Sequence, residues 1–148
     1  MSAASSPIVR LDTRTLSTGA VAGIIGGIPF GMMMGMMGML PMIGMLAGVN
    51  SAFAGMLVHA AISAVTGAVY GSFAPRLPQT WRIAALAGLV YGMIWWVLGA
   101  LVLMPALLGM PQNILVIGTT QWLSLMGHMI FGIVLSLSFL WLYNRAPR

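Results

Sequence analysis

The sequence contains no cysteine, no lysine and no glutamate, and Asp12 is its only acidic residue. Without cysteine the chain has no disulfide, no thiolate nucleophile and no cysteine-based metal site. A single carboxylate cannot form the pair that general acid–base catalysis commonly uses. No serine stands with a recognisable base and orienting group. We therefore expect a protein that is not an enzyme.

Charge of either sign is also scarce. Charged residues make up 5% of the 148 residues, hydrophobic residues make up 60%, and the mean hydropathy is +1.02. A soluble domain carries about 25% charged residues, so this chain cannot build a water-facing surface and must be solvated by lipid. The arginines form no stripe that could follow a phosphate backbone, so nucleic acid is not an expected partner. The expected partners are the lipid bilayer and other membrane subunits or further copies of the chain.

Four long apolar runs predict four membrane-spanning helices, because a spanning helix needs about 20 mostly apolar residues. The predicted spans cover residues 18–40, 52–73, 83–103 and 120–143. The expected fold class is therefore all-α, an integral membrane four-helix bundle. Residues 1–16 would form a short cytoplasmic tail, and residues 17–148 a single membrane domain. The first apolar run is longer than the ~7–15 residues of a signal-peptide core, so we do not expect a targeting peptide.

The placement of the arginines predicts how the spans are oriented. Two arginines precede the first span, two lie between the second and third, and two follow the fourth: Arg10, Arg14, Arg76, Arg82, Arg145 and Arg148. With an even number of spans these regions share one side of the membrane, which the positive-inside rule makes cytoplasmic. We expect a multi-pass protein of the cell (inner) membrane with both termini in the cytoplasm. Trp81 and Trp141 would lie at that same interface, as an aromatic belt does.

Similar stretches in the two halves of the sequence predict an internal repeat. The stretch "GMMGMLPMIG", which begins at Gly35, matches "GALVLMPALL", which begins at Gly99. The stretch "GMLVHAAIS" matches "SLMGHMIFG", which pairs His59 with His128. Because each unit has two spans, both copies cross the membrane in the same direction. The bundle is therefore predicted to consist of two tandem helix hairpins in parallel orientation.

Glycines recur every four residues in the first span, and glycine is also frequent in the second. Rows of small residues allow helix backbones to approach closely in lipid, where packing drives helix association. We therefore predict that these glycines pack the helices together. The predicted packing residues are Gly19, Gly23, Gly27, Gly31 and Gly35 in the first span and Gly67 and Gly71 in the second.

The stretch "GMMMGMMGMLPMIGM" holds eight of the fifteen methionines. One interpretation is structural, because methionine is unbranched and fills irregular gaps beside a glycine groove. The other is a soft-metal site, because thioethers select Cu(I). Met32 with Met36, and Met33 with Met37, are pairs one helical turn apart and resemble the pore motif of copper-uptake trimers. Those proteins differ from this one in having three spans and a methionine-rich outer tail.

His59 and His128 are the only acidic or basic side chains inside the predicted spans, where a polar group is a functional candidate by default. Gly55 and Ser124 precede them by one helical turn. Each neutral ring could donate a hydrogen bond to another helix. The two rings could instead ligate a haem or chlorophyll, since this spacing resembles the ligand motif of light-harvesting helices. They could also line a proton or solute path, or form a metal site with a neighbouring methionine. We expect no bound cofactor, with haem, chlorophyll or copper as the alternatives.

Several segments resemble the small four-span membrane proteins of bacteria and archaea that include the YagU-type inner-membrane proteins. The resemblance covers most of residues 19–142 and rests on the glycine-rich first span and on "LVHAAISAVTGAVYG", "GLVYGMIWWVLGALVLMP" and "GHMIFGIVL". It implies a four-span topology and brings no activity with it. The function we expect is that of a non-catalytic accessory or structural subunit of a membrane complex. The alternatives are a small transporter or channel, including one for a soft metal, and a tetrapyrrole-binding protein that uses the two histidines. The polar path of a transporter would need Ser63, Thr66, Ser72, Ser136 and Ser138.

Overall fold

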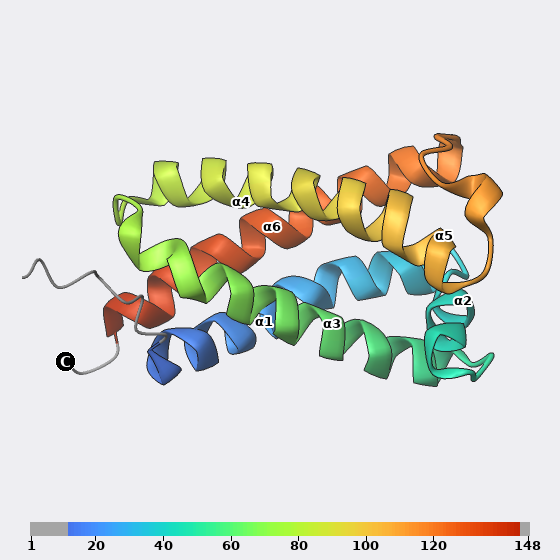
Figure 1. Ribbon diagram of the computed structural model, residues 1–148. Coiled ribbons are helices and arrows are strands. Elements are labelled where there is room, and N and C mark those ends of the chain that lie inside the picture. The colour runs from blue at the N-terminus through green and yellow to red at the C-terminus, as the bar shows by residue number, and fades with distance from the viewer. Residues whose placement is uncertain (1–11, 146–148) are drawn as a thin grey trace, which may run out of the picture.

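The computed structural model describes residues 12–145, which fold into helices and the turns between them (Figure 1). In this range four helices are long and apolar enough to cross a membrane, which confirms the predicted all-α four-helix architecture. They are α1 (Thr13–Met36), α3 (Ala52–Phe73) with its 3-10 extension η2 (Ala74–Arg76), α4 (Trp81–Trp95), which continues as a helix to Leu107, and α6 (Thr119–Arg145). Residues 1–11 and 146–148, which include Arg10, Arg148 and most of the predicted tail, lie outside the described residues.

Side-chain caps begin three of these helices. Asp12 Oδ1 accepts a hydrogen bond from the backbone N–H of Arg14 at 3.0 Å, and Ser51 and Thr80 cap α3 and α4 in the same way. A cap satisfies an N–H group that has no partner inside the helix. The carboxylate of Asp12 also interacts favourably with the positive end of the helix dipole. The only acid of the chain is therefore used at the start of α1.

The first helix ends earlier than the apolar composition predicts. Gly38 adopts a positive φ of 67°, and Met39 N donates to Met34 O at 2.9 Å across it. This is the Schellman type of helix end, in which glycine takes the left-handed conformation that other residues avoid. The helix α1 (Thr13–Met36) thus begins and ends earlier in the chain than the predicted span 18–40. The chain then forms α2 (Leu40–Gly44) and η1 (Met45–Ala47), and α2 packs against α3.

The third span changes geometry in its second half. The π-helix η3 (Trp96–Leu103) follows α4 directly and leads into α5 (Met104–Leu107), and a single 3-10 turn, η4 (Pro111–Asn113), lies in the next loop. Pro105 has no N–H to donate to the preceding turn. The Leu101 carbonyl instead accepts a hydrogen bond from Leu115 N at 2.9 Å, which folds the loop back onto the helix.

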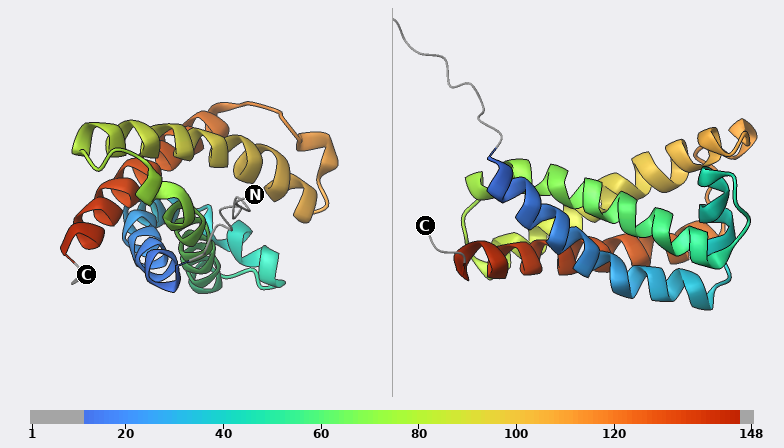
Figure 2. Two further views of the ribbon diagram at one scale, coloured as in Figure 1. Left: turned by 60° about the vertical axis from the view of Figure 1, so that its left-hand side comes forward. Right: turned by 90° about the horizontal axis from the view of Figure 1, so that it is seen from below.

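The four long helices do not contact one another equally. α1 packs along both α3 and α6, and α4 packs along α6, whereas the backbones of α3 and α4 scarcely approach each other (Figures 1 and 2). α1 and α6 therefore form the centre of the bundle, with α3 beside the first and α4 beside the second.

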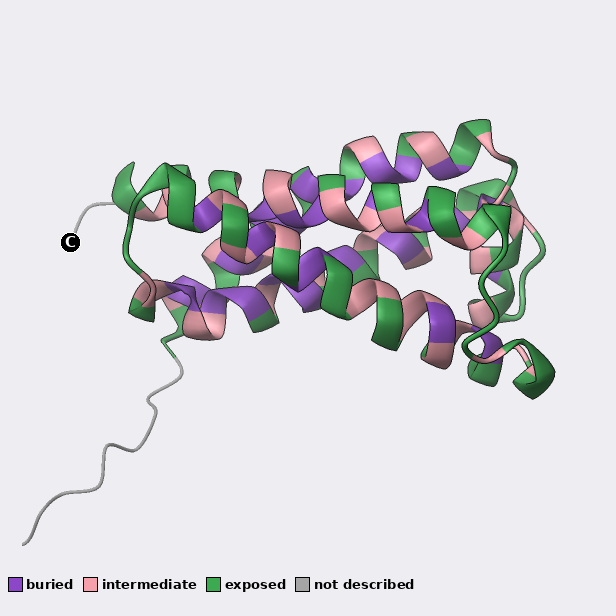
Figure 3. Cartoon of the chain, turned by 90° about the horizontal axis from the view of Figure 1, so that it is seen from above, coloured by how far each residue is buried: buried purple, intermediate pink, exposed green. Residues whose placement is uncertain are grey.

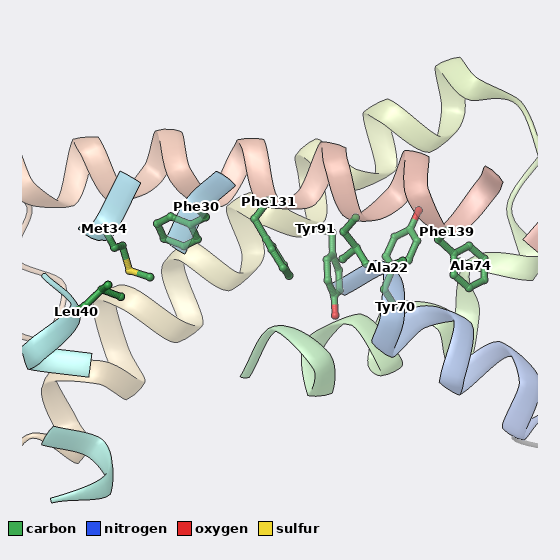
Figure 4. Close-up of a cluster of buried hydrophobic side chains, with 10 residues drawn as sticks. Ala22, Phe30, Met34, Leu40, Tyr70, Ala74, Tyr91, Phe131 and Phe139 are labelled. Atoms are coloured by element: carbon green, nitrogen blue, oxygen red, sulfur yellow. The ribbon is translucent and has the colours of Figure 1, made fainter. Parts of the chain in front are cut away.

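Aromatic side chains dominate the buried interior, and apolar side chains also cover the outside. Buried aromatic residues from all four long helices line the centre (Figure 4): Phe30, Tyr70, Tyr91, Phe131 and Phe139. Buried positions follow the inner faces of the helices and exposed positions the outer faces (Figure 3). Among the outward residues, Met36 is 82% exposed and Phe53 is 75% exposed. Soluble monomers rarely expose apolar surface so extensively, so this surface is suited to lipid.

Candidate functional site

α1 and α3 approach each other closely at a contact where glycines meet glycines. A Cβ atom on Gly67 would lie 2.6 Å from Gly23 Cα, and one on Gly71 would lie 3.1 Å from Gly19 Cα. Real Cβ atoms essentially never come within 3.0 Å of such a neighbour. These four glycines, which we call the α1–α3 seam, allow two backbones to touch in the way that small residues do in membranes.

The other three predicted packing glycines have different surroundings. A Cβ on Gly27 would lie 2.9 Å from Ser63 Cβ, and one on Gly31 would lie 3.0 Å from the flexible Met56 Sδ. Gly35 is exposed, and its Cβ would make only an ordinary contact of 3.5 Å with a Leu40 side chain. A row of residues four apart drifts by about 40° at each step. Gly35 has therefore rotated away from α3.

Two glycines that the sequence reasoning missed bring α1 and α6 together. A Cβ on Gly26 would lie 2.8 Å from Phe131 O and 2.9 Å from Leu135 N. A Cβ on Gly127 would overlap the Phe30 ring. Neither glycine belongs to a row of four-residue spacing, so the sequence carried no periodic signal for this contact.

A third glycine contact joins α4 to α6. A Cβ on Gly132 would lie 2.9 Å from Gly92 N, and one on Gly88 would overlap the Gly132 carbonyl. Gly92 lies against the backbone of His128, whereas Gly27 lies beside the ring of His59. The four-residue spacing of Gly88 and Gly92 was a readable signal, of the same kind as the row in the first span.

The two histidines use their ring nitrogens differently. His59 Nε2 is 2.9 Å from the Gly27 carbonyl on α1, and His128 Nδ1 is 2.8 Å from the Ser124 carbonyl on its own helix. A carbonyl can only accept, so the neutral rings carry their protons on Nε2 of His59 and Nδ1 of His128. Phe30 lies edge-on to both rings, with centroid distances of 5.3 and 4.7 Å. His59 therefore ties α3 to α1, whereas His128 bonds within α6.

These positions restrict how a tetrapyrrole could be held. A Cβ on Gly27 would lie 3.4 Å from His59 Nε2, so the α1 backbone covers this nitrogen. A macrocycle on His59 Nε2 would first have to separate α1 from α3. His128 uses Nδ1 for its hydrogen bond, so the lone pair on its Nε2 is not used in a hydrogen bond within residues 12–145. Of the two histidines, His128 is therefore the one that could ligate through Nε2.

The four candidate metal-binding methionines do not converge. Met32 and Met36 are 61% and 82% exposed on the outer face of α1. Met33 is half-buried and turns towards α6, where its methyl group would lie 2.6 Å from a Cβ on Gly127. Met37 follows the last residue of α1. In the described part of the chain, no group of three or more His, Cys, Asp or Glu side chains could hold a metal ion.

The hydroxyl groups proposed for a polar path are mostly used within their own helices. Thr66 Oγ1 donates to Ile62 O at 2.9 Å, and Ser136 Oγ donates to Ile133 O at 3.0 Å. Ser72 bonds in the same way one turn back. A cavity of about 10 Å³, the room of a single water molecule, lies near the arginine-bearing end of the bundle. Its lining includes Tyr70, Ala74, Gln79, Ala84 and Ser136.

The fold and its apolar surface define a multi-pass membrane protein with a tightly packed helical interior. Comparison with known proteins assigns no family, because no protein-family model matches the chain and neither a curated protein nor a solved structure matches it.

Proposed function

We propose that this protein is a non-catalytic accessory or structural subunit that acts through the outer surface of its helices by binding other membrane proteins. The observation that carries the proposal is the closed interior. Glycine contacts join α1 to α3, α1 to α6 and α4 to α6, and aromatic side chains fill the centre. A bundle packed in this way has little space for a substrate, while apolar side chains cover its outer faces.

Isolation in a mild detergent tests this role. We expect a tagged chain, extracted after cross-linking in the membrane, to carry one or more membrane proteins in fixed proportion. A chain that is monodisperse without partners, and that moves ions or solutes across liposomes, would establish the transporter or channel alternative in place of this one.

The proposed location is the inner membrane, with both termini in the cytoplasm. Supporting this, the described arginines lie on the first turns of α1 and α4, on η2 and at the end of α6, all at one end of the bundle (Figure 1). The loops at the other end are uncharged. A fluorescent reporter fused after Arg148 should be active, and alkaline phosphatase inserted between Gln112 and Asn113 should also be active. The reverse pattern would overturn the orientation.

The tandem repeat and the relationship to YagU-type proteins belong to the same proposal. The repeat is supported by the similar packing of the two hairpins. The α1–α3 pair and the α4–α6 pair are both antiparallel and both packed through glycine. A duplicated hairpin gives two similar lateral faces, which suits a subunit that contacts partners on more than one side.

A further inference from the structure

Two tryptophan–arginine pairs stand at the charged end of the bundle. At the start of α4, Arg82 Cζ lies 5.5 Å from the centre of the Trp81 ring. At the end of α6, Arg145 Cζ lies 4.2 Å from the centre of the Trp141 ring. Both indoles face outwards, with exposed fractions of 66% for Trp81 and 54% for Trp141. Each guanidinium therefore lies over an exposed indole.

These two arginines keep their hydrogen-bonding edges open. A cation–π contact uses the face of the guanidinium, whereas its five N–H donors point outwards in the plane of the group. Within residues 12–145, neither Arg82 nor Arg145 has a hydrogen bond or an ion pair from its side chain to the protein. Arg76 differs, because its Nη1 donates to Ser72 O at 2.5 Å. An anion from outside the chain can therefore reach two complete sets of donors.

The side chains of the protein carry far less negative than positive charge. The sequence has six arginines and one acid, and that acid caps α1. At the ends of membrane-spanning helices, tryptophan places its ring at the level of the lipid headgroups. A guanidinium beside it is level with the phosphates, which it can bind in bidentate fashion. The indole can therefore contact the upper part of an acyl chain while the guanidinium binds the phosphate of the same lipid.

We propose that each of the two pairs, Trp81–Arg82 and Trp141–Arg145, binds the phosphate of one anionic phospholipid in the leaflet at this end of the bundle. The ligand is a lipid and not a free anion, because half of each site is an exposed indole that needs an apolar neighbour. The two pairs lie on different helices, so the chain holds two such lipids independently.

Native mass spectrometry can count these lipids on the protein released from neutral detergent. Phosphatidylglycerol and phosphatidylcholine with the same acyl chains are the probes. We expect two phosphatidylglycerol molecules to remain on each chain under conditions that remove phosphatidylcholine. Arg82→Gln and Arg145→Gln should each remove one lipid, and the double variant should remove both. A hydrogen bond to a charged group contributes about 1.5–3 kcal/mol, so each substitution should weaken binding at least about tenfold at its own site.

Arg76→Gln is the matched control, because it removes the same charge at the same end without disturbing either pair. It should retain both lipids, and circular dichroism should show that every variant remains helical. Equal loss of lipid from Arg76→Gln would show that only the overall charge matters and would overturn the proposal. Equal retention of phosphatidylcholine would also overturn it. Displacement of the lipid by millimolar inorganic phosphate would show that the sites bind free anions instead.

Discussion

The glycines of α1 and α3 differ sharply in what a methyl group would meet. In Gly67→Ala the new Cβ would press on the backbone of Gly23, which cannot move without parting the helices. We expect the free energy of unfolding to fall by at least the ~1–3 kcal/mol typical of overpacking, measured by thermal or denaturant unfolding in detergent. Gly35→Ala is the control, because Gly35 has room and alanine favours the helix by up to about 1 kcal/mol. Similar losses in both variants would refute the α1–α3 seam.

The two histidines should also differ in their contribution to stability. His59→Ala removes a hydrogen bond between α3 and α1, and we expect the free energy of unfolding to fall by about 1–2 kcal/mol. His128→Ala removes a bond within α6 only, so its loss should be smaller. The same unfolding measurement compares the two variants. A larger loss for His128 would mean that its ring stabilises helix packing more than its bonding indicates.

The absorption spectrum of the purified protein tests the cofactor alternatives. We expect no Soret band and no far-red band, and less than one copper per chain by elemental analysis. A visible band that His128→Ala abolishes and His59→Ala leaves intact would identify His128 as a tetrapyrrole ligand, through the nitrogen that its hydrogen bonding leaves free. One copper per chain would revive the methionine hypothesis.

At the scale of helices, Tyr91 is the main polar link between α4 and α3. Its hydroxyl donates to the Thr66 carbonyl at 2.5 Å, and its ring lies edge-on to Tyr70. Tyr91→Phe keeps the ring and removes the hydrogen bond, so we expect a loss of about 0.5–1.5 kcal/mol in unfolding experiments. Tyr143→Phe is the control, because Tyr143 stacks on Phe139 and its hydroxyl has no hydrogen bond within residues 12–145. A loss as large in the control would contradict this role of Tyr91.

The four long helices were largely predictable, because a helix that crosses a bilayer needs a long apolar segment and such segments are easy to recognise in a sequence. The predicted range 52–73 coincides with α3. The end of α1 was missed because composition cannot distinguish an apolar helix from an apolar turn, although Gly38 followed by Pro41 was a readable stop signal. The π-helix carried no signal that separates it from an α-helix.

The candidate site was predictable only in part, for a related reason. The four-residue row selected Gly19 and Gly23, which lie against the backbone of α3, since spacing along a helix defines a face. Which neighbouring helix a given face contacts depends on how the helices assemble, and one helix's spacing does not show this. The row therefore could not show that Gly35 lies away from α3 or that Gly26 packs against α6. The sequence also selected both histidines but could not show that one bonds across helices and the other within its own.

At the scale of the whole molecule, two helix contacts differ in kind: backbones touch between α1 and α3, whereas side chains alone join α3 and α4. Spin labels at exposed positions can compare them. A pair at Val21 and Val65 spans α1 and α3, and a pair at Val65 and Val90 spans α3 and α4. We expect a narrow distance distribution for the first pair and a broader one for the second, because only the first pair of helices has touching backbones. Equal widths would mean that aromatic packing alone holds α3 and α4 as firmly as glycine does.

The unequal contacts also make the molecule mechanically anisotropic. The contacts α1–α3, α1–α6 and α4–α6 are closed by glycine, whereas α3 and α4 are bridged by the side chain of Tyr91. The helices α1 and α6 therefore form the central pair, and α3 and α4 are the outer pair. Separation of α3 from α4 would break the Tyr91 hydrogen bond and the contact between the Tyr70 and Tyr91 rings, but it would leave the backbone contact between α1 and α6 intact. A change in the lateral pressure of the bilayer would therefore alter the cross-section of the protein along the direction from α3 to α4, and a partner bound to the outer faces of these two helices would be affected first.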